Sequence, residues 1–377
     1  MRVALFTNNY LPFRGGVTTA VETLREGLER LGHRTWVFAP APAAPAEDPP
    51  RVFRYPSIPA PTYPGFALPL PFSPRLGRAA RGLGLDVIHA QHPFLLGVTA
   101  RRFARRQRLP LVFTYHTRYE KYAHYVPLPQ RFVRALAVRL SCRFADSADV
   151  VVARGVGTRV AVVPTGVPVE QFVPGDPAAA RRHLGLPSGA PLCLYVGRLD
   201  REKSVERVIA AFGSIAGAMS DARLWLVGQG SHAEALRRAA EASSARDRIH
   251  FRGGVARAAL PPYYQAADLF LFASETETQG LVLAEAHACG LPAVAVRASG
   301  VEEVVVDGET GILTKSDAGD LADAAIALLL DPERRRAMGA AGRAVAERSF
   351  SASAQVAAMA AEYSRLLAPS PLASPPR

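Results

Sequence analysis

The segment best suited to chemistry is Tyr195–Ser204, with the sequence YVGRLDREKS. An apolar run that is typical of a buried strand ends at Gly197, and Arg198 and Lys203 follow it where a helix is expected to begin. Because open parallel sheets bind ligands at the carboxyl ends of their strands, the two cations are placed to neutralise a leaving diphosphate. The alternative is a pair of solvated surface cations, since basic residues are commonly exposed.

A second segment, Ser274–Pro292, combines a glycine with two carboxylates in the sequence SETETQGLVLAEAHACGLP. Gly280 lies at the start of an expected helix, where glycine lets backbone N–H groups approach an anion. Glu277 in the loop can accept hydrogen bonds from sugar hydroxyls, and Glu285 on the helix can take both hydroxyls of a ribose. The alternatives are a charge that complements the helix dipole at Glu277 and a solvated helix residue at Glu285.

Two further glycine turns lie between a strand and a helix. Gly228 belongs to an LVGQG run, and Gly15 and Gly16 follow the first strand. Such turns permit a phosphate to approach the backbone. Close packing of helix on strand explains them equally well.

A histidine and several tyrosines share residues 114–127, TYHTRYEKYAHYVP. His116 falls at the end of an apolar strand, and Tyr119 and Tyr122 follow in a segment whose aromatic rings suit contact with sugar or lipid. A structural histidine and a small satellite core are the alternatives. No Asp-x-Asp pair and no His/Cys cluster of metal-ligand spacing occurs in the sequence, so we expect neither a metal nor another cofactor at the diphosphate.

Strands alternating with helices from end to end predict an α/β protein with a parallel sheet in each half. A proline-rich segment, residues 40–74, is expected to be a partly ordered loop. The expected domains are 1–165 and 166–351, with a helix at 352–367 that packs back on the first domain and a disordered tail at 368–377. The expected strands are 2–7, 35–40, 86–90, 111–116, 149–153, 191–197, 222–228, 248–253, 268–274 and 292–296, and the expected helices include 17–31, 94–106, 318–330, 332–348 and 352–367.

Composition limits the class of protein. A length of 377 residues suits two domains, and three scattered cysteines indicate a reducing compartment rather than a disulfide framework. The start of the chain does not have the pattern of a signal peptide, and no apolar stretch is long enough to span a membrane, so a cytoplasmic location is expected. The net charge of +12 arises entirely in residues 1–175, where 23 basic residues face 10 acidic ones. Such asymmetry points to an anionic partner surface.

Together these motifs resemble a known family. The GRLDREKS and SETETQGLVLAEAHACGLP segments, the VVPTGV run at Val162–Val167 and the early Gly-Gly loop are similar to those of the group-1 retaining glycosyltransferases of the GT-B fold. The resemblance implies two Rossmann-like domains facing a central cleft, with the acceptor on the first domain and a nucleotide-sugar donor on the second. It implies substitution on the same face of the sugar, with the leaving phosphate oxygen taking the acceptor proton.

The resemblance also implies roles for single residues. Arg198 and Lys203 would grip the diphosphate, and Gly280 and Leu281 would offer it backbone N–H groups. Glu285 would bind the ribose and Glu277 the transferred sugar. His116 would lie beside the sugar ring, across the cleft, and Gly15, Gly16 and Gly228 would line the donor site. The catalytic set is then His116, Arg198, Lys203 and Glu277.

For the acceptor, YHTRYEKYAHYVP and SETETQGL are similar to segments of the bacterial diacylglycerol glucosyltransferases. A transfer of glucose from UDP-glucose to a membrane lipid is therefore expected. The alternatives are a GDP-mannose-dependent lipid mannosyltransferase, a non-catalytic sugar-nucleotide binder, and an epimerase or NAD enzyme, the last disfavoured because no clean G-x-G-x-x-G follows the first strand.

The charge asymmetry and one basic segment indicate a membrane partner rather than nucleic acid. Arg131 and Arg134 belong to a basic segment, and residues 132–144 within it have the apolar and basic faces of an interfacial helix. The enzyme is thus expected to be peripheral on the inner face of the cell membrane. The alternative is an ordinary amphipathic helix packed on the sheet.

One segment departs from the family pattern. After the strand at Asp149–Ala153, Arg154–Arg159 runs almost directly into Val160–Pro164, although a parallel crossover needs about a dozen residues or more. Either a helix is missing or the two runs are not neighbouring parallel strands, and acceptor binding on that side is in doubt.

Overall fold

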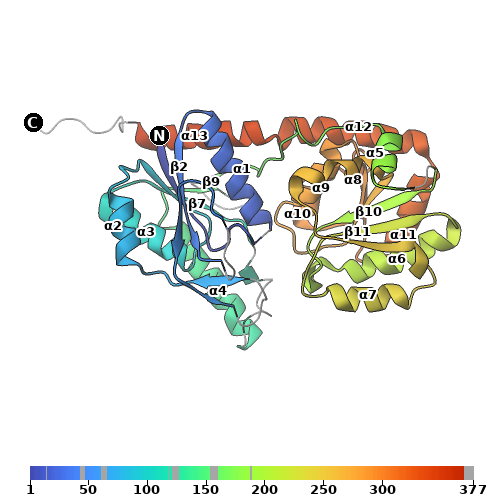
Figure 1. The fold of residues 1–377 in the computed structure, drawn as a ribbon, viewed down its shortest axis with the longest axis horizontal. Coiled ribbons are helices and arrows are strands. Elements are labelled where there is room, and N and C mark those ends of the chain that lie inside the picture. Colours follow the sequence, from blue (N-terminus) through green and yellow to red (C-terminus); the bar gives the residue numbers. More distant parts are fainter. Residues whose placement is uncertain are drawn as a thin grey trace, which may run out of the picture. The chain divides into compact units, whose positions relative to one another are not determined.

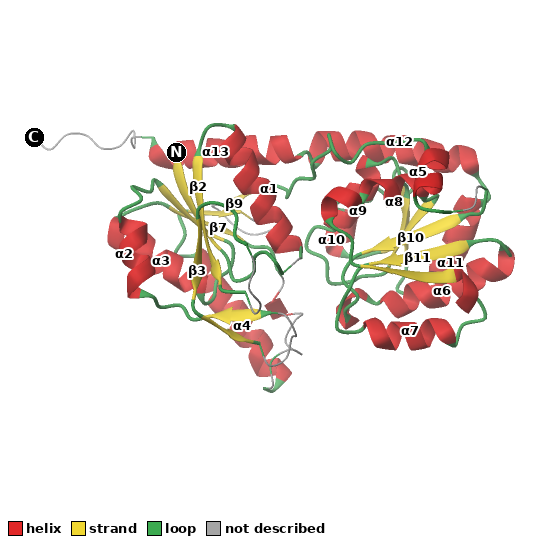
Figure 2. Cartoon of the chain, in the orientation of Figure 1, coloured by secondary structure: helices red, strands yellow, loops and turns green. Residues whose placement is uncertain are grey.

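The chain forms two compact units in a computed structural model that describes residues 1–13, 15–42, 47–60, 66–117, 119–120, 126, 128–152, 160–186 and 189–368. The first unit comprises Met1–Pro164 with Ala352–Arg377, and the second comprises Thr165–Ser351. Each unit is a layered α/β domain (Figures 1 and 2). The division lies next to the boundary expected at residue 165. Residues 369–377 of the expected disordered tail lie outside the described residues.

The first unit is built on a seven-stranded sheet in the order β3-β2-β1-β6-β7-β8-β9, with parallel neighbours throughout. Strands buried on both faces read as near-continuous apolar runs, which is why the central ones stand out in the sequence. The strands are β1 Arg2–Phe6, β2 Arg34–Pro40, β3 Val52–Tyr55, β6 Val87–Ala90, β7 Leu111–Thr114, β8 Val150–Val152 and β9 Val160–Ala161.

Helices cover both faces of this sheet. On one face, α1 (Gly16–Arg30) and the closing helix α13 (Ala352–Leu367) pack together against the apolar side chains of β1 and β2. On the other face, α2 (Pro74–Arg81) buries Ala80, and α3 (Leu96–Gln107) buries Leu96, Ala100 and Ala104. The helix α4 (Gln130–Ala145) joins that core mainly through Phe144.

The proline-rich segment was expected to be a loop, and this expectation is wrong for part of it. The strand β3 joins the edge of the sheet beside β2, and β4 (Ser57–Pro59) pairs antiparallel with β5 (Ala67–Pro69). The run VFRY of β3 contains β-formers and no proline, and prolines are tolerated at strand ends and sheet edges. Residues 43–46 and 61–65 lie outside the described part of the chain.

The short connection after β8 does join neighbouring parallel strands. Val151 pairs with Val160 and Val152 with Ala161, so the alternative that these runs are not parallel neighbours is wrong. Residues 153–159, which connect the two strands, are not among those described.

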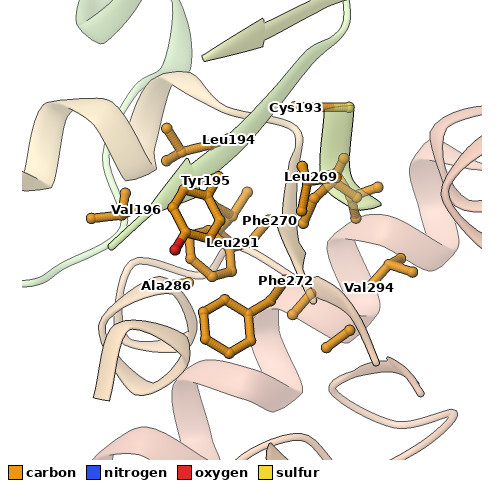
Figure 3. Close-up of a cluster of buried hydrophobic side chains, with 14 of the residues drawn as sticks. Cys193, Leu194, Tyr195, Val196, Leu269, Phe270, Phe272, Ala286, Leu291 and Val294 are labelled. Carbon is orange, nitrogen blue, oxygen red and sulfur yellow. The ribbon is translucent and has the colours of Figure 1, made fainter. Parts of the chain in front are cut away.

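The second unit has a six-stranded parallel sheet in the order β12-β11-β10-β13-β14-β15. Its core is a dense apolar cluster around β10 and β13 (Figure 3). The sequence did not indicate β15. The strands are β10 Leu192–Val196, β11 Arg223–Val227, β12 Ile249–Gly253, β13 Leu269–Phe272, β14 Ala293–Val296 and β15 Gly311–Thr314.

Helices also cover both faces of the second sheet. In Figure 1, α6, α7 and α11 lie on one face and α5, α8, α9 and α12 on the other. The order of strands reverses between β10 and β13, so a crevice is expected at their carboxyl ends. The helices are α5 Pro177–His183, α6 Val205–Ala218, α7 Ala233–Glu241, α8 Pro261–Ala266, α9 Leu281–Ala288, α10 Ser299–Glu302, α11 Ala318–Leu329 and α12 Pro332–Ser349.

Candidate active site

The two charged motifs of the second unit meet at the point where its strand order reverses. The first motif follows β10 and the second follows β13, and these strands are hydrogen-bonded neighbours. Lys203 Nζ lies 2.5 Å from Glu277 Oε1, and the two side chains are only 12% and 16% exposed. The interpretation of Lys203 as a solvated surface cation is therefore wrong.

The Lys203 ammonium keeps Glu277 ionised. Burial by itself would raise the pKa of the Glu277 carboxyl, but the charge of Lys203, hydrogen bonds from Lys203 and Ser274, and the charge of Arg198 together bring that pKa below its usual value. An ionised carboxylate can only accept hydrogen bonds, which suits it to bind hydroxyl groups.

Arg198 is fixed by two carboxylates that sequence reasoning did not identify. Its Nη2 donates to Glu202 Oε1 at 2.7 Å, and its Nη1 donates to Asp200. Asp200 is 1% exposed and also accepts from the backbone N–H and the hydroxyl of Ser231, at 2.7 and 2.8 Å. Asp200 thereby ties Arg198 to the loop after β11. The acidic residues that alternate with the cations in GRLDREKS were the available signal.

Gly228 brings the loops after β10 and β11 into close contact. A Cβ atom at this position would lie 1.8 Å from the carbonyl oxygen of Gly197, and the backbone φ of +151° also favours glycine. Close packing therefore accounts for Gly228 without a ligand. Its role toward a phosphate stays a prediction.

Glu285 lies on α9 and is 4% exposed, so the interpretation as a solvated helix residue is wrong. Its Oε1 accepts from Arg257 Nε at 2.7 Å, and its Oε2 accepts from the hydroxyl of Tyr264 at 3.0 Å. Burial, with the adjacent Glu285 carboxylate, raises the pKa of Tyr264 well above its usual value, so the phenol stays a donor. Each carboxylate oxygen of Glu285 has a second lone pair for a ligand hydroxyl.

The turn before α9 suits an anion. Gly280 has a left-handed φ of +57° and precedes Leu281, the first residue of the helix. A Cβ atom at Gly280 would lie 3.0 Å from Leu283 Cδ1, so both conformation and space favour glycine here. The first N–H groups of a helix have no partner within it and attract anions.

The remaining candidates lie in the first unit, also at carboxyl ends of strands. His116 follows β7 and is half-buried, with its Nε2 2.6 Å from Gln91 Oε1. Burial lowers the pKa of His116 to about 4, so its ring is neutral at physiological pH.

Gly15 and Gly16 begin α1, and a Cβ atom at Gly16 would meet nothing within 4 Å. Packing therefore does not require glycine at that position.

The expected acceptor and membrane residues fall into two groups. Tyr119 stacks edge-on against Phe94, with ring centroids 4.9 Å apart, while Tyr122 lies outside the described residues. Arg131 and Arg134 are exposed on α4, a helix of 16 residues in which only Ser141 and Phe144 are buried. Most of α4 is thus not packed on the sheet.

The exposed surface of α4 includes large apolar side chains. Phe132, Leu136 and Val138 are 57%, 40% and 47% exposed.

Among the helices that the structure describes, none combines the length and the apolar character needed to cross a bilayer. Within the same described ranges, no three His, Cys, Asp or Glu side chains are grouped so that they could hold a metal ion.

Two family models match the chain, one for each half. Residues 14–171 match "Glycosyltransferase Family 4", and residues 177–345 match "Glycosyl transferases group 1". An alpha-monoglucosyldiacylglycerol synthase from Acholeplasma laidlawii is 32% identical over 336 residues, 83% of this chain and 84% of that protein. A GDP-mannose-dependent alpha-mannosyltransferase from Mycobacterium tuberculosis is 32% identical over 370 residues, 93% of each chain.

Solved structures share the fold over nearly the full length. The sucrose-phosphate synthase from Thermosynechococcus elongatus is 26% identical with a TM-score of 0.77, covering 97% of this chain and 98% of that one. Anabaena HepE, solved in complex with UDP-glucose, is 21% identical with a TM-score of 0.78, covering 97% of this chain and 100% of that one. The second likeness concerns the fold alone.

Proposed function

The chain belongs to the group 1 glycosyltransferases and has the GT-B fold, and on this premise we propose a retaining, metal-independent transfer of glucose from UDP-glucose to a membrane lipid such as diacylglycerol. The observation that carries the proposal is the meeting of Arg198, Lys203 and Glu277 at the carboxyl ends of β10 and β13. Cations and a carboxylate at a strand-order reversal suit a sugar diphosphate.

The leaving diphosphate is held by charges that the protein supplies. Arg198 and Lys203 provide two fixed cations, and the N–H groups at the start of α9, beginning with Leu281, add a partial positive charge. Because these groups neutralise the charge that develops on the leaving oxygen, the proposal needs no metal ion and no other cofactor. The carboxylates that hold the cations keep them preorganised.

The sugar and the ribose are bound by the two glutamates. Glu277, ionised beside Lys203, accepts hydrogen bonds from hydroxyls of the transferred sugar, and Glu285 accepts those of the ribose. As the bond from the sugar to phosphate breaks, the acceptor hydroxyl attacks the same face and its proton passes to the leaving phosphate oxygen. Neutral His116 is assigned to the sugar ring, where its second ring nitrogen can accept a hydrogen bond from a hydroxyl without adding charge.

A lipid acceptor is supported by α4 and by the relatives. Exposed Phe132 and Leu136 lie on the same helix as exposed Arg131 and Arg134, and the helix contains no acidic residue. Apolar and basic side chains together favour adsorption to an anionic bilayer. The glucosyltransferase relative is named for a glucosyldiacylglycerol product. We therefore assign the enzyme to the cytoplasmic face of a membrane, bound peripherally.

A second donor has comparable support. The relative named as a GDP-mannose-dependent mannosyltransferase is equally identical and covers more of the chain. Mannose from GDP-mannose is thus the alternative to glucose from UDP-glucose.

A transfer assay separates these candidates. Purified protein is incubated with radiolabelled UDP-glucose or GDP-mannose and vesicles that contain diacylglycerol and an anionic phospholipid. The proposal expects a glucolipid with α-linkage, formed equally in a chelator. Mannolipid alone would select the second donor, a β-linked product would refute retention, and loss of product in chelator would refute metal independence.

A further inference from the structure

Gln91 lies just after the strand β6 of the first unit. This is the point where the strand order of the first sheet reverses between β1 and β6. Its backbone N–H donates to the carbonyl of Phe6 at 2.8 Å, which holds the turn to the sheet edge. The residue is 2% exposed. Ligands of such folds bind at this kind of reversal.

The buried amide of Gln91 is only partly satisfied. Its Oε1 lies 2.6 Å from Nε2 of His116. Its Nε2 is buried and has no hydrogen-bond partner in the part of the chain that the structure describes. Nearly all buried polar side-chain atoms in native proteins have a partner, so this amide nitrogen at a sheet reversal can donate to a water or to a ligand group.

The contact with Gln91 also sets the tautomer of His116. With the amide oxygen toward the ring, the acceptor is Gln91 Oε1, so His116 Nε2 carries the hydrogen. In the neutral ring, Nδ1 is then the acceptor atom. The hydrogen bond therefore fixes both the orientation of the imidazole and the position of its proton.

Other ionisable groups around His116 have their own partners. His89 contacts the hydroxyls of Tyr363 and Thr114, each at 2.6 Å. His92 Nδ1 accepts from a backbone N–H at 3.1 Å. Burial lowers the pKa of both rings to about 3, and the nearby Tyr115 hydroxyl reaches Glu120 Oε2 at 3.5 Å. Among the described residues, the groups around His116 are thus uncharged histidines, a tyrosine and one acid at the margin.

We propose that Gln91 is a positioning residue that fixes the tautomer and orientation of His116 and donates its unpaired amide N–H to a substrate hydroxyl. This inference rests on the proposed function, because it takes the hydroxyl from one of the two substrates of the transfer. The hydroxyl belongs to the donor sugar or to the acceptor, and the chemistry of recognition is the same for both.

The positioning role is tested without turnover by histidine ring NMR on the full-length, ligand-free protein. Gln91→Glu places a carboxylate against His116 Nε2–H, so the pKa of His116 should rise by about one pH unit or more. Thr114→Val is the matched control, because Thr114 contacts His89 instead, and it should leave the His116 titration unchanged. His116→Gln identifies the signal. An identical His116 pKa in wild type and Gln91→Glu would overturn the positioning role.

The substrate contact is tested with Gln91→Leu, and Gln91→Glu keeps the size of the side chain should the leucine variant fold poorly. If the hydroxyl belongs to the donor sugar, Gln91→Leu lowers the affinity for UDP-glucose about tenfold and leaves the affinity for UDP unchanged. If it belongs to the acceptor, donor binding is unchanged and the acceptor KM rises about tenfold. Unchanged donor affinity together with an unchanged acceptor KM would refute the contact.

The pH profile gives a further arm that a merely structural role would not move. In Gln91→Glu, transfer should decline as pH falls through the raised pKa of His116, whereas the wild type shows no such decline above about pH 5. Absence of transfer by wild-type protein with both donors refutes the proposed function instead, while the NMR titration still decides the role of Gln91 toward His116.

Discussion

Replacing Lys203 by methionine leaves the Glu277 carboxylate without its cation, and this change should reduce both stability and transfer. The structure allows the two effects to be separated. In the variant Lys203→Met/Glu277→Gln no isolated charge is left, so stability should recover, whereas the cation for the diphosphate is still missing and transfer should not recover.

The magnitude follows from the geometry of the pair. Two unit charges 4 Å apart at an effective dielectric constant of about 20 attract by about 4 kcal/mol, and Lys203 and Glu277 are closer than that, with 12% and 16% of their side chains exposed. Desolvation offsets much of this attraction in the intact pair. Removing one partner of a buried pair costs about 3–5 kcal/mol, and the residual exposure favours the lower value.

The assay is thermal unfolding of the full-length protein, followed by initial transfer rates. For a unit of this size, a loss of about 3 kcal/mol lowers the melting temperature by about 6–12 °C. The exposed pair Arg238–Glu234, 66% and 74% exposed, supplies the control, since Arg238→Met should change stability by less than about 0.5 kcal/mol.

Two outcomes would refute the reasoning about this pair. One is a double variant no more stable than Lys203→Met, which would mean that the lost stability does not come from an isolated carboxylate. The other is transfer by Lys203→Met within about threefold of wild type, since the loss of a cation that stabilises the leaving group should cost about a hundredfold or more.

The remaining predictions concern packing, pH and the membrane. Gly228→Ala, whose Cβ would lie 1.8 Å from a backbone carbonyl oxygen, should lose about 2 kcal/mol or more in urea unfolding, whereas Gly16→Ala should change by less than about 0.5 kcal/mol. Burial lowers the pKa of His89 to about 3, so the unfolded chain takes up a proton below about pH 6.5 while the folded chain does not. The free energy of unfolding should therefore fall by about 2 kcal/mol through this group between about pH 7 and pH 5. His89→Gln should make the free energy of unfolding depend less steeply on pH. A free energy of unfolding that rises over this range would contradict the low pKa of His89. Reversing Arg131 and Arg134 to glutamate should weaken sedimentation with anionic vesicles about tenfold or more at low salt, and unchanged binding would remove α4 as the docking surface.

Much of the fold could be predicted because parallel strands in the centre of a sheet are buried on both faces. Leu192–Val196 and Leu269–Phe272 are unbroken apolar runs for that reason. Edge strands lack this signal. Val52–Tyr55 lies among prolines, and Gly311–Thr314 has only two large apolar side chains, so neither was recognised.

The candidate site was recognisable residue by residue, but its contacts were not. Arg198 and Lys203 follow a strand directly, which makes them visible in the sequence. The partner of Lys203 is Glu277 in a separate loop, so this contact depends on how the loops pack. The partners of Arg198 lie two and four residues further along the same segment. The pairing of Glu285 with Arg257 and Tyr264 depends on the placement of α8 and the preceding turn against α9, and residue periodicity carries no information about such placement.

The most direct test of the central claim is calorimetric titration of UDP and UDP-glucose into the wild type and three variants. The account predicts that Arg198→Met and Lys203→Met weaken both ligands by about tenfold or more, because both carry the diphosphate. It predicts that Glu277→Gln weakens UDP-glucose while leaving UDP nearly unchanged, because only the former carries the sugar. If each ligand bound the wild type and all three variants with the same affinity, the assignment of this site to the donor would be contradicted.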